Sequence, residues 1–253
     1  MSRGACDVPG WRRRTSELAA AAYRRAGRFA WHFAQGKLRH DPLFAGLLRL
    51  GLIPSEARVV DLGCGQGVLS AWLHAAAARF DVGDWPAGWP QPPRGLRLRG
   101  VELMRRDVER ARAALGDKAD IVQGDMRAAD LRGADAVMLF DVLHYIEVAE
   151  QDALLRRVHA ELPPGGVLLL RVGDADGGWR FRCSAWVDRV ATRVRGHKAP
   201  PVHCRGLGEW TGLLLGLGFD LRIIPMSEGM PFANVLLHAL KPARPARAAA
   251  SLQ

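Results

Sequence analysis

The stretch VVDLGCGQG (59–67) decides the fold. It begins as a short apolar run of the kind that forms a buried parallel strand. Gly63, Gly65 and Gly67 follow at once, and glycines let a backbone turn tightly and approach a ligand where a Cβ atom would collide. The spacing is GxGxG and not the GxGxxG of dinucleotide sites, because the residue three positions after Gly65 is Val68. The stretch therefore predicts a strand and a ligand-binding turn in an α/β fold.

The rest of the chain alternates between strand and helix patterns. The predicted strands are 58–62, 96–103, 120–123, 134–140, 167–172, 219–224 and 234–240. The predicted helices between them are 67–78, one that ends at Ala114, 148–162 and 210–217. The Pro- and Trp-rich segment 81–94 is a predicted loop, because it can continue neither element. This alternation implies a doubly wound, mainly parallel sheet covered on both faces.

The domain organisation follows from length and pattern. From Thr15 to about Leu52 the apolar residues recur at helical spacing and no strand signal appears, so we expect an N-terminal cap, residues 1–52, with two or three helices. Residues 53–241 form one predicted ligand-binding α/β domain, and the Pro-, Arg- and Ala-rich tail 242–253 is predicted to be disordered.

Composition excludes several classes of protein. The chain has 253 residues, a net charge of +10 and four cysteines without metal-binding spacing, so neither a metal site nor a disulfide scaffold is expected. No secretory signal or membrane-spanning stretch is visible, which predicts a cytoplasmic protein without a transmembrane segment. The positive charge reflects either an Arg-rich composition alone or attraction to nucleic acid, an anionic membrane surface or an acidic carrier protein.

Acidic residues at the carboxyl ends of the first three strands suggest the ligand. Asp61 precedes the glycines and would suit the ammonium group of an amino-acid cofactor. Glu102 ends the second strand and can accept hydrogen bonds from both ribose hydroxyls. Asp125 follows the third strand and can accept from an adenine amino group, while Met126 packs on the ring. The alternative for any one of them is a solvated loop acid.

With these motifs over residues 58–171, the sequence resembles the class I S-adenosylmethionine (SAM) dependent methyltransferases. The resemblance implies a Rossmann-like seven-stranded sheet with its last strand antiparallel, SAM as methyl donor and S-adenosyl-L-homocysteine (SAH) as product. It places Asp61, Gly63 and Gly65 at the methionine portion, and Asp141 in the loop bordering cofactor and substrate. The full set of cofactor-binding residues that it implies is Asp61, Gly63, Cys64, Gly65, Glu102, Leu103, Asp125, Met126, Phe140 and Asp141.

A base would lie beside the fourth strand, since methyl transfer needs alignment, a water-poor site and in some cases removal of a proton. His144 lies there and has the ordinary pKa range of a base for a phenolic or hydroxyl proton. The alternative is that His144 only packs or hydrogen-bonds within its loop.

Candidate substrate residues come from the cap and from the segments after the fourth and fifth strands. They are Trp31, His32, His40, Tyr145, Arg171 and Trp179. The competing interpretation of the cap residues is an aromatic core, with Tyr23, Phe29 and Phe33 as further members. Asp174, Arg180, Phe181 and Arg182, near Trp179, are additional candidates for recognising an aromatic acid or a tethered acyl chain.

A finer resemblance concerns five segments, KLRHDPLFAGLLRLGLIP (37–54), DWPAGWP (84–90), FDVLHYI (140–146), WVDRVATRVRGH (186–197) and SEGMPFANVLL (227–237). They are similar to a bacterial methyltransferase group of aryl-polyene, xanthomonadin-type pigment biosynthesis. This resemblance implies methylation of a hydroxyaryl headgroup, on a ring carbon or the phenolic oxygen, with the substrate free or presented by an acidic acyl carrier protein.

Two other functions compete with this interpretation. An RNA methyltransferase would suit the basic charge, but the Asn/Asp-Pro-Pro-aromatic pattern of enzymes that act on exocyclic base nitrogens is replaced here by FDVL (140–143), and no nucleic acid is expected as partner. The chain would otherwise be a SAM-binding partner protein without activity. The paired-Asp and Asn pattern of metal-dependent catechol methylation is not found, and the oligomeric state is left open.

Overall fold

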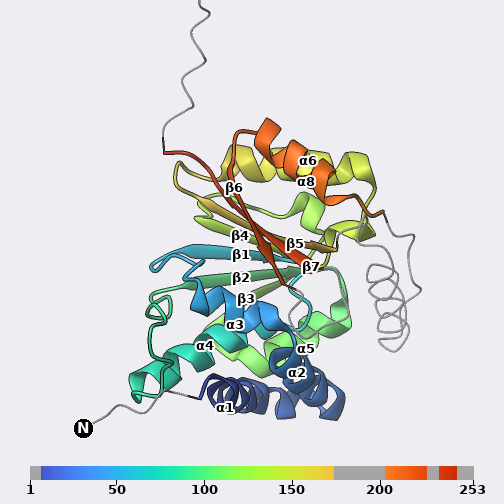
Figure 1. Cartoon of the computed structure of the whole chain (residues 1–253). Helices are drawn as coiled ribbons and strands as arrows, with labels where there is room; N and C mark the ends of the chain where they lie inside the picture. Colours follow the sequence, from blue (N-terminus) through green and yellow to red (C-terminus); the bar gives the residue numbers. More distant parts are fainter. Residues whose placement is uncertain (1–6, 174–202, 227–233, 244–253) are drawn as a thin grey trace, which may run out of the picture. The chain divides into compact units, whose positions relative to one another are not determined.

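The computed structural model describes residues 7–173, 203–226 and 234–243 (Figure 1). The chain divides into two compact units, Met1–Asp130 and Leu131–Gln253, which are taken in turn.

The first unit contains three parallel strands, β1 (Arg58–Leu62), β2 (Arg97–Glu102) and β3 (Asp120–Gln123). Val60 lies opposite Arg99, and Glu102 lies opposite Gln123. β1 is buried in every residue except Arg58, as expected for a strand that is covered on both faces. Since all three strands run in the same direction, their carboxyl ends, with Asp61 and Glu102, meet at one edge.

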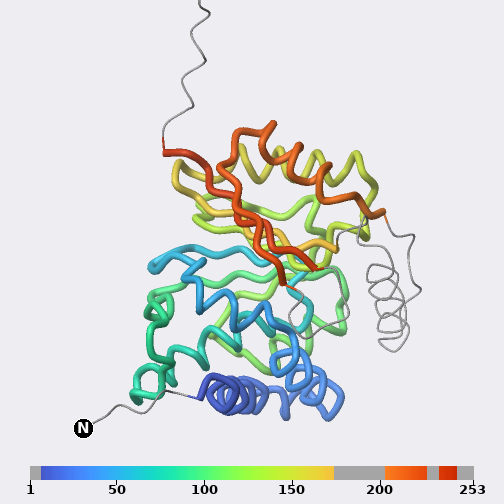
Figure 2. Tube along the Cα trace, viewed as in Figure 1, coloured from blue at the N-terminus to red at the C-terminus, as the bar shows by residue number. Residues whose placement is uncertain are grey.

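Five helices accompany these strands: three precede the sheet, one follows β1 and one follows β2. They are α1 (Val8–Ala21), α2 (Arg28–His40), α3 (Pro42–Arg49), α4 (Val68–Asp81) and α5 (Arg105–Leu115), with short 3-10 turns η1 (Ala22–Ala26), η2 (Gly116–Lys118) and η3 (Met126–Ala128). α1 packs against α2 and α4, and η1 packs against α5 (Figure 2). The predicted helical cap therefore exists, and it lies on the helices of the first unit.

The predicted loop 81–94 supplies tryptophans to this packing. Trp11 of α1 is fully buried, and its ring lies edge-on to Trp72, Trp85 and Trp89 at centroid distances of 5.6, 5.2 and 5.1 Å. Its indole Nε1 donates a hydrogen bond to the carbonyl oxygen of Asp84 at 2.9 Å. Aromatic pairs in such geometries add to the free energy gained by burial, so the loop fastens the first cap helix.

The second unit contains β4 (Ala136–Phe140), β5 (Val167–Gly173), β6 (Asp220–Pro225) and β7 (Asn234–Leu240). β4 and β5 are parallel, whereas β7 is antiparallel to both β5 and β6. The helices are α6 (Val148–Glu161) and α8 (Leu207–Gly216), and the 3-10 turn η4 (Leu143–Tyr145) follows β4. The strand order is β3-β2-β1-β4-β5-β7-β6, which confirms the predicted seven-stranded sheet with its last strand antiparallel.

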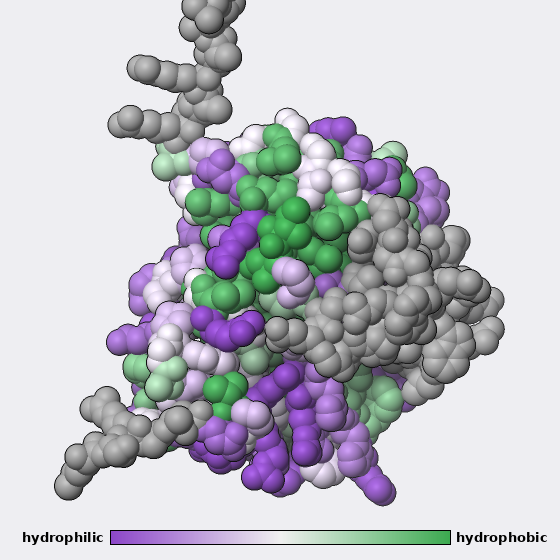
Figure 3. All heavy atoms as spheres, viewed as in Figure 1, coloured by the Kyte–Doolittle hydropathy of each residue, from purple (hydrophilic) through white to green (hydrophobic). Residues whose placement is uncertain are grey.

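Apolar side chains also reach the surface of the second unit. Figure 3 shows hydrophobic residues gathered over the region of β6 and α8. Leu215 of α8 and Ile223 of β6 are 57% and 48% exposed. β6 is the last strand in the order, so Ile223 lies at an edge of the sheet.

Helix ends differ most from the sequence prediction. α1 begins at Val8, before the predicted start near Thr15, with a proline in its first turn. α8 begins at Leu207 and not at Trp210, because the Glu209 carboxylate accepts a hydrogen bond from the Gly206 N–H at 3.0 Å. None of the helices in the described ranges is long and apolar enough to cross a membrane. The boundaries at residues 52 and 241 remain predictions, and residues 244–253 of the predicted tail lie outside the described part.

Candidate functional site

The glycine turn, residues 63–67, is hydrogen-bonded to the end of β2. Gly63, Gly65 and Gly67 have φ angles of 72°, 56° and 72°, in the left-handed region that favours glycine. The backbone N–H groups of Gly63 and Cys64 both donate to the carbonyl oxygen of Val101, at 2.8 and 3.2 Å. The turn is thereby fixed to the neighbouring strand, with the backbone conformation that the GxGxG spacing predicted.

Glu102 binds this turn as well as ending β2. Its carboxylate, in a residue 9% exposed, accepts from the Gly65 N–H at 2.9 Å and from the Met104 N–H at 2.8 Å. A carboxylate has about four lone-pair positions, so further acceptor capacity is left for hydroxyl donors. Glu102, which is predicted to bind the ribose, therefore also stabilises the glycine turn. The sequence pattern does not reveal this second role.

Asp61 is a buried acid beside a second acid. It is 7% exposed, and no described residue donates a hydrogen bond to its carboxylate. Burial and the neighbouring Glu102 charge raise the pKa of Asp61 to about 7. A cation placed beside Asp61 would favour the ionised form of its carboxyl group. The environment therefore fits the prediction that Asp61 binds the ammonium group of the cofactor.

The cap reaches the glycine turn through Tyr23. This residue of η1 is fully buried, and its hydroxyl donates to the carbonyl oxygen of Gln66 at 2.8 Å. Burial, together with the nearby Cys64 and Asp61, raises the pKa of Tyr23, which keeps the hydroxyl protonated as a donor. The sequence predicted Tyr23 only as a member of an aromatic cap. No sequence pattern indicated its hydrogen bond to the glycine turn. Cys64 is a buried thiol whose pKa burial also raises, so it is unreactive.

Asp125 follows β3 and begins η3. Its side chain accepts from the Arg127 backbone N–H at 2.8 Å and forms an ion pair with the Arg127 guanidinium at 2.5 Å. The Arg127 hydrogen bond lowers the pKa of Asp125, so the carboxylate stays ionised as an acceptor. Met126 is half-buried beside it, and Leu103 is 59% exposed after β2.

The cap candidates are only partly brought together. The rings of Trp31 and His32 lie 4.5 Å apart, and the Arg24 guanidinium lies over the Trp31 ring at 5.3 Å. His40 is exposed at the far end of the same helix. Trp31 and His32 therefore remain predicted substrate contacts, while His40 does not join them. Trp179, like the candidates Asp174, Arg180, Phe181 and Arg182, lies outside the described residues.

In the second unit, Arg171 pairs with Asp141. Arg171 is 2% exposed, and its Nε donates to Asp141 Oδ1 at 2.8 Å while its Nη2 contacts Oδ2. Asp141 has a φ of 58° directly after β4, where Phe140 ends the strand half-buried. Arg171, which is predicted to contact the substrate, therefore holds the Asp141 side chain in place in the loop after β4.

His144 and Tyr145 lie in η4, in the same loop. Their ring centroids are 4.1 Å apart, and both residues are half-buried. His144 as the base stays a prediction; the structure places it in the turn that follows β4. Within the described ranges, no three His, Cys, Asp or Glu side chains form a group that could hold a metal ion.

Two glycine substitutions test the ligand position and the packing of the turn, and because both glycines have left-handed φ angles, alanine at either position also costs stability. Gly65→Ala is expected to weaken SAH binding at least tenfold, because the added Cβ meets no protein atom within 4 Å and projects into open space in the turn. In Gly67→Ala the Cβ would lie 2.6 Å from Leu115 Cδ1, so we expect that variant to lose about 1–3 kcal/mol of unfolding free energy. Calorimetric titration and thermal denaturation measure the two effects. Unchanged SAH affinity in Gly65→Ala would contradict the proposed ligand position.

Comparison with known proteins gives the same class. The methyltransferase domain family matches residues 30–207. A carboxy-S-adenosyl-L-methionine synthase of Chromohalobacter salexigens is 36% identical over 131 residues, covering 48% of this chain and 43% of that protein. One from Citrobacter koseri is 28% identical over 130 residues, covering 49% and 47%. The chain thus spans about half the length of the curated relatives it matches.

Solved structures match over most of the chain. Magnesium protoporphyrin IX methyltransferase from Synechocystis with bound SAH has a TM-score of 0.55 at 18% identity, covering 91% of this chain and 97% of that one. Human N-acetylserotonin methyltransferase in complex with SAM has a TM-score of 0.58 at 20% identity, covering 90% and 60%. At these identities the likeness shows the fold.

The chain has the fold of these solved methyltransferases. It belongs to the methyltransferase domain family.

Proposed function

We propose that the chain transfers a methyl group from SAM to a small-molecule acceptor with a hydroxyaryl group. The observation that carries the cofactor part is the joint arrangement of the glycine turn, the buried Asp61 and the Glu102 carboxylate that braces the turn. SAM supplies a methyl group that is bound to a sulfonium sulfur, which activates the methyl carbon for displacement. Asp61 would hold the ammonium group and Glu102 the ribose.

The chain's own residues have to align the acceptor and exclude water, since an in-line displacement gains most of its rate from these two effects. Asp125 would accept the adenine amino group through its ionised carboxylate. Phe140 ends β4 and Asp141 follows it, with its carboxylate bound to the Arg171 guanidinium. His144 in that loop would take the proton from the acceptor hydroxyl as the methyl group arrives.

His144→Ala is expected to lower turnover by about 10²–10⁴-fold, the usual contribution of a positioned general base, and to leave SAH affinity unchanged. His74, whose Nε2 lies 2.9 Å from the Lys118 carbonyl oxygen in the first unit, provides a matched control, because His74→Ala should alter neither quantity. Steady-state turnover and calorimetric titration give both values. Turnover of His144→Ala equal to that of the natural chain would assign His144 to packing alone.

The hydroxyaryl acceptor is proposed from the resemblance to the pigment-associated methyltransferases over segments such as FDVLHYI (140–146). The net charge of +10 supports presentation by an acidic acyl carrier protein. The test uses methyl-labelled SAM with three acceptors: a hydroxyaryl polyene on its carrier protein, the same acid free, and the carrier-bound analogue without the hydroxyl group. Label in the first acceptor supports the proposal, label in the free acid alone removes the carrier, and label in none of them rejects this acceptor.

A second candidate comes from the relatives named carboxy-S-adenosyl-L-methionine synthase, to one of which the chain is 36% identical over 131 residues. On this alternative the chain would form a carboxylated SAM and methylate nothing. Mass spectrometry of the nucleotide released from purified, heat-denatured protein distinguishes the two. A species heavier than SAM by one carboxyl group favours the synthase, whereas SAM or SAH alone favours methyl transfer.

A further inference from the structure

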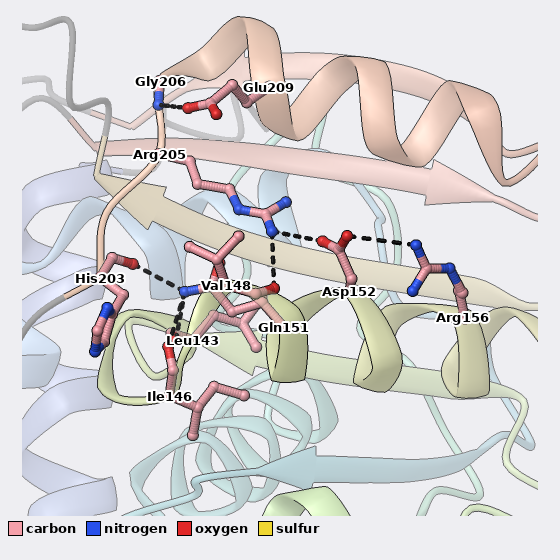
Figure 4. Close-up of polar contacts among 10 residues, drawn as sticks. All are labelled: Leu143, Ile146, Val148, Gln151, Asp152, Arg156, His203, Arg205, Gly206 and Glu209. Carbon is pink, nitrogen blue, oxygen red and sulfur yellow. Dashed lines mark hydrogen bonds and ion pairs between the residues drawn. The ribbon is translucent and has the colours of Figure 1, made fainter.

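Gln151 is a buried amide in the first turns of α6, and its surroundings are unusual. The residue is fully buried, and its Nε2 lies within hydrogen-bonding distance of three backbone carbonyl oxygens. These belong to Leu143 at 3.1 Å, Ile146 at 3.1 Å and His203 at 2.8 Å (Figure 4). Three acceptors around one atom require a donor there, so the nitrogen and not the oxygen of the amide faces them.

Two of these carbonyls bracket the turn that carries His144. Leu143 begins η4, and Ile146 follows its last residue. The carbonyl oxygen of His144 itself accepts from the backbone N–H of His203 at 2.8 Å. The η4 turn is therefore held at three carbonyl oxygens: those of Leu143 and Ile146 accept from Gln151, and that of His144 accepts from His203.

Arg205 holds the chain next to His203 against α6. It is 7% exposed, and its Nη2 donates to the Val148 carbonyl oxygen at 2.8 Å and to Asp152 Oδ1 at 2.5 Å (Figure 4). Its guanidinium also lies over the Trp210 ring at 5.1 Å. Residues 203–206 are thus held against the beginning of α6, which keeps the His203 backbone in register with η4.

We propose that Gln151 is a positioning residue for His144: its side-chain amide fixes the η4 turn, and through it the imidazole, while the stretch anchored by Arg205 holds the other side. This inference rests on the proposed role of His144 as the base. The energetic argument is that a buried carbonyl without a donor is costly. Loss of the amide would leave the Ile146 carbonyl without this donor and the Leu143 carbonyl with only the Ile146 backbone N–H, so η4 would sample other conformations.

The test compares Gln151→Met, which keeps the length of the side chain and removes its donor, with Arg156→Gln, a change on the same helix whose guanidinium is 59% exposed. The full chain is labelled with ¹³C at histidine Cε1, and the His144 resonance is assigned by its loss in His144→Ala. We expect Gln151→Met to move or broaden the His144 resonance and to speed amide exchange at residues 143–146 at least tenfold. Arg156→Gln should change neither, and SAH affinity should remain that of the natural chain in both variants.

An unmoved His144 resonance and unchanged exchange in folded Gln151→Met would overturn the inference. Should Gln151→Met not fold, Gln151→Asn supplies the same readout, because it retains an amide that is too short to reach all three carbonyls. These signals do not depend on turnover. The proposed function is tested separately: full turnover of His144→Ala would reject His144 as the base. In that case the resonance and exchange data would still show whether Gln151 holds the η4 turn in place.

Discussion

Asp141→Ala should lower the free energy of unfolding by about 3–5 kcal/mol, the usual cost of removing one partner of a buried ion pair. The reason is that the Arg171 guanidinium, in a residue 2% exposed, has its Nε 2.8 Å from Asp141 Oδ1. Without the carboxylate, a buried cation would lose its bidentate partner. The φ of 58° at Asp141 adds to the cost, because alanine tolerates the left-handed region less well than aspartate.

Urea denaturation of the full chain measures this loss. The double variant Asp141→Ala with Arg171→Met is the decisive control, because replacing both charges by apolar groups recovers much of the stability that a single removal costs. A loss below about 1 kcal/mol in Asp141→Ala, the range of a surface pair, would show that the pair does not stabilise the loop after β4.

Asp61→Asn should stabilise the ligand-free chain above neutral pH and weaken SAH binding at least tenfold. Burial, and then the Glu102 charge, raise the pKa of Asp61 to about 7 from its ordinary value of 3.8. The folded chain therefore binds more protons than the unfolded chain between about pH 4 and pH 7, so this residue lowers stability as pH rises through that window. The shift corresponds to roughly 4 kcal/mol, which Asn would remove.

Denaturation at pH 5 and pH 8 checks the direction: the gain in stability of the variant over the natural chain should be clearly larger at pH 8 than at pH 5. Cofactor binding offers a second readout, because an ammonium group beside Asp61 favours its ionised form. SAH binding at pH 6.5 should release a proton, seen as a dependence of the binding enthalpy on the ionisation enthalpy of the buffer. Equal proton release by Asp61→Asn would assign the proton to another group.

The elements with the clearest signals were predicted best. β1, β3 and β7 have the predicted bounds, because each is a short apolar run between strong turn residues. The mainly parallel sheet followed from the alternation of strand and helix patterns, whereas the antiparallel last strand followed from the family resemblance. The beginnings of α1 and α8 were missed because they depend on a proline and a capping glutamate that the hydrophobic spacing does not register.

The site residues stay predictions from the sequence, and the structure adds contacts that the sequence did not show. Asp61 and the glycines stand next to one another in the motif, and the pairing of β2 with β1 brings Glu102 to them. The hydroxyl of Tyr23 on the Gln66 carbonyl, and the pairing of Arg171 with Asp141, join positions far apart in the chain. No periodicity links such positions, so one sequence could not show that Arg171 is occupied by an acid. The predicted contacts from Trp179 fall on residues that the structure does not describe.

Calorimetric titration of the full chain with SAH, repeated on Glu102→Ala, tests the cofactor site most directly. The Glu102 carboxylate accepts from the Gly65 and Met104 N–H groups and would hold the ribose hydroxyls, so its loss removes both the brace and the ligand contact. We expect one SAH molecule bound per natural chain, and binding at least tenfold weaker, about 1.4 kcal/mol, in the variant. Absence of SAH binding by the folded natural chain, or equal affinity in Glu102→Ala, would contradict the assignment of this site.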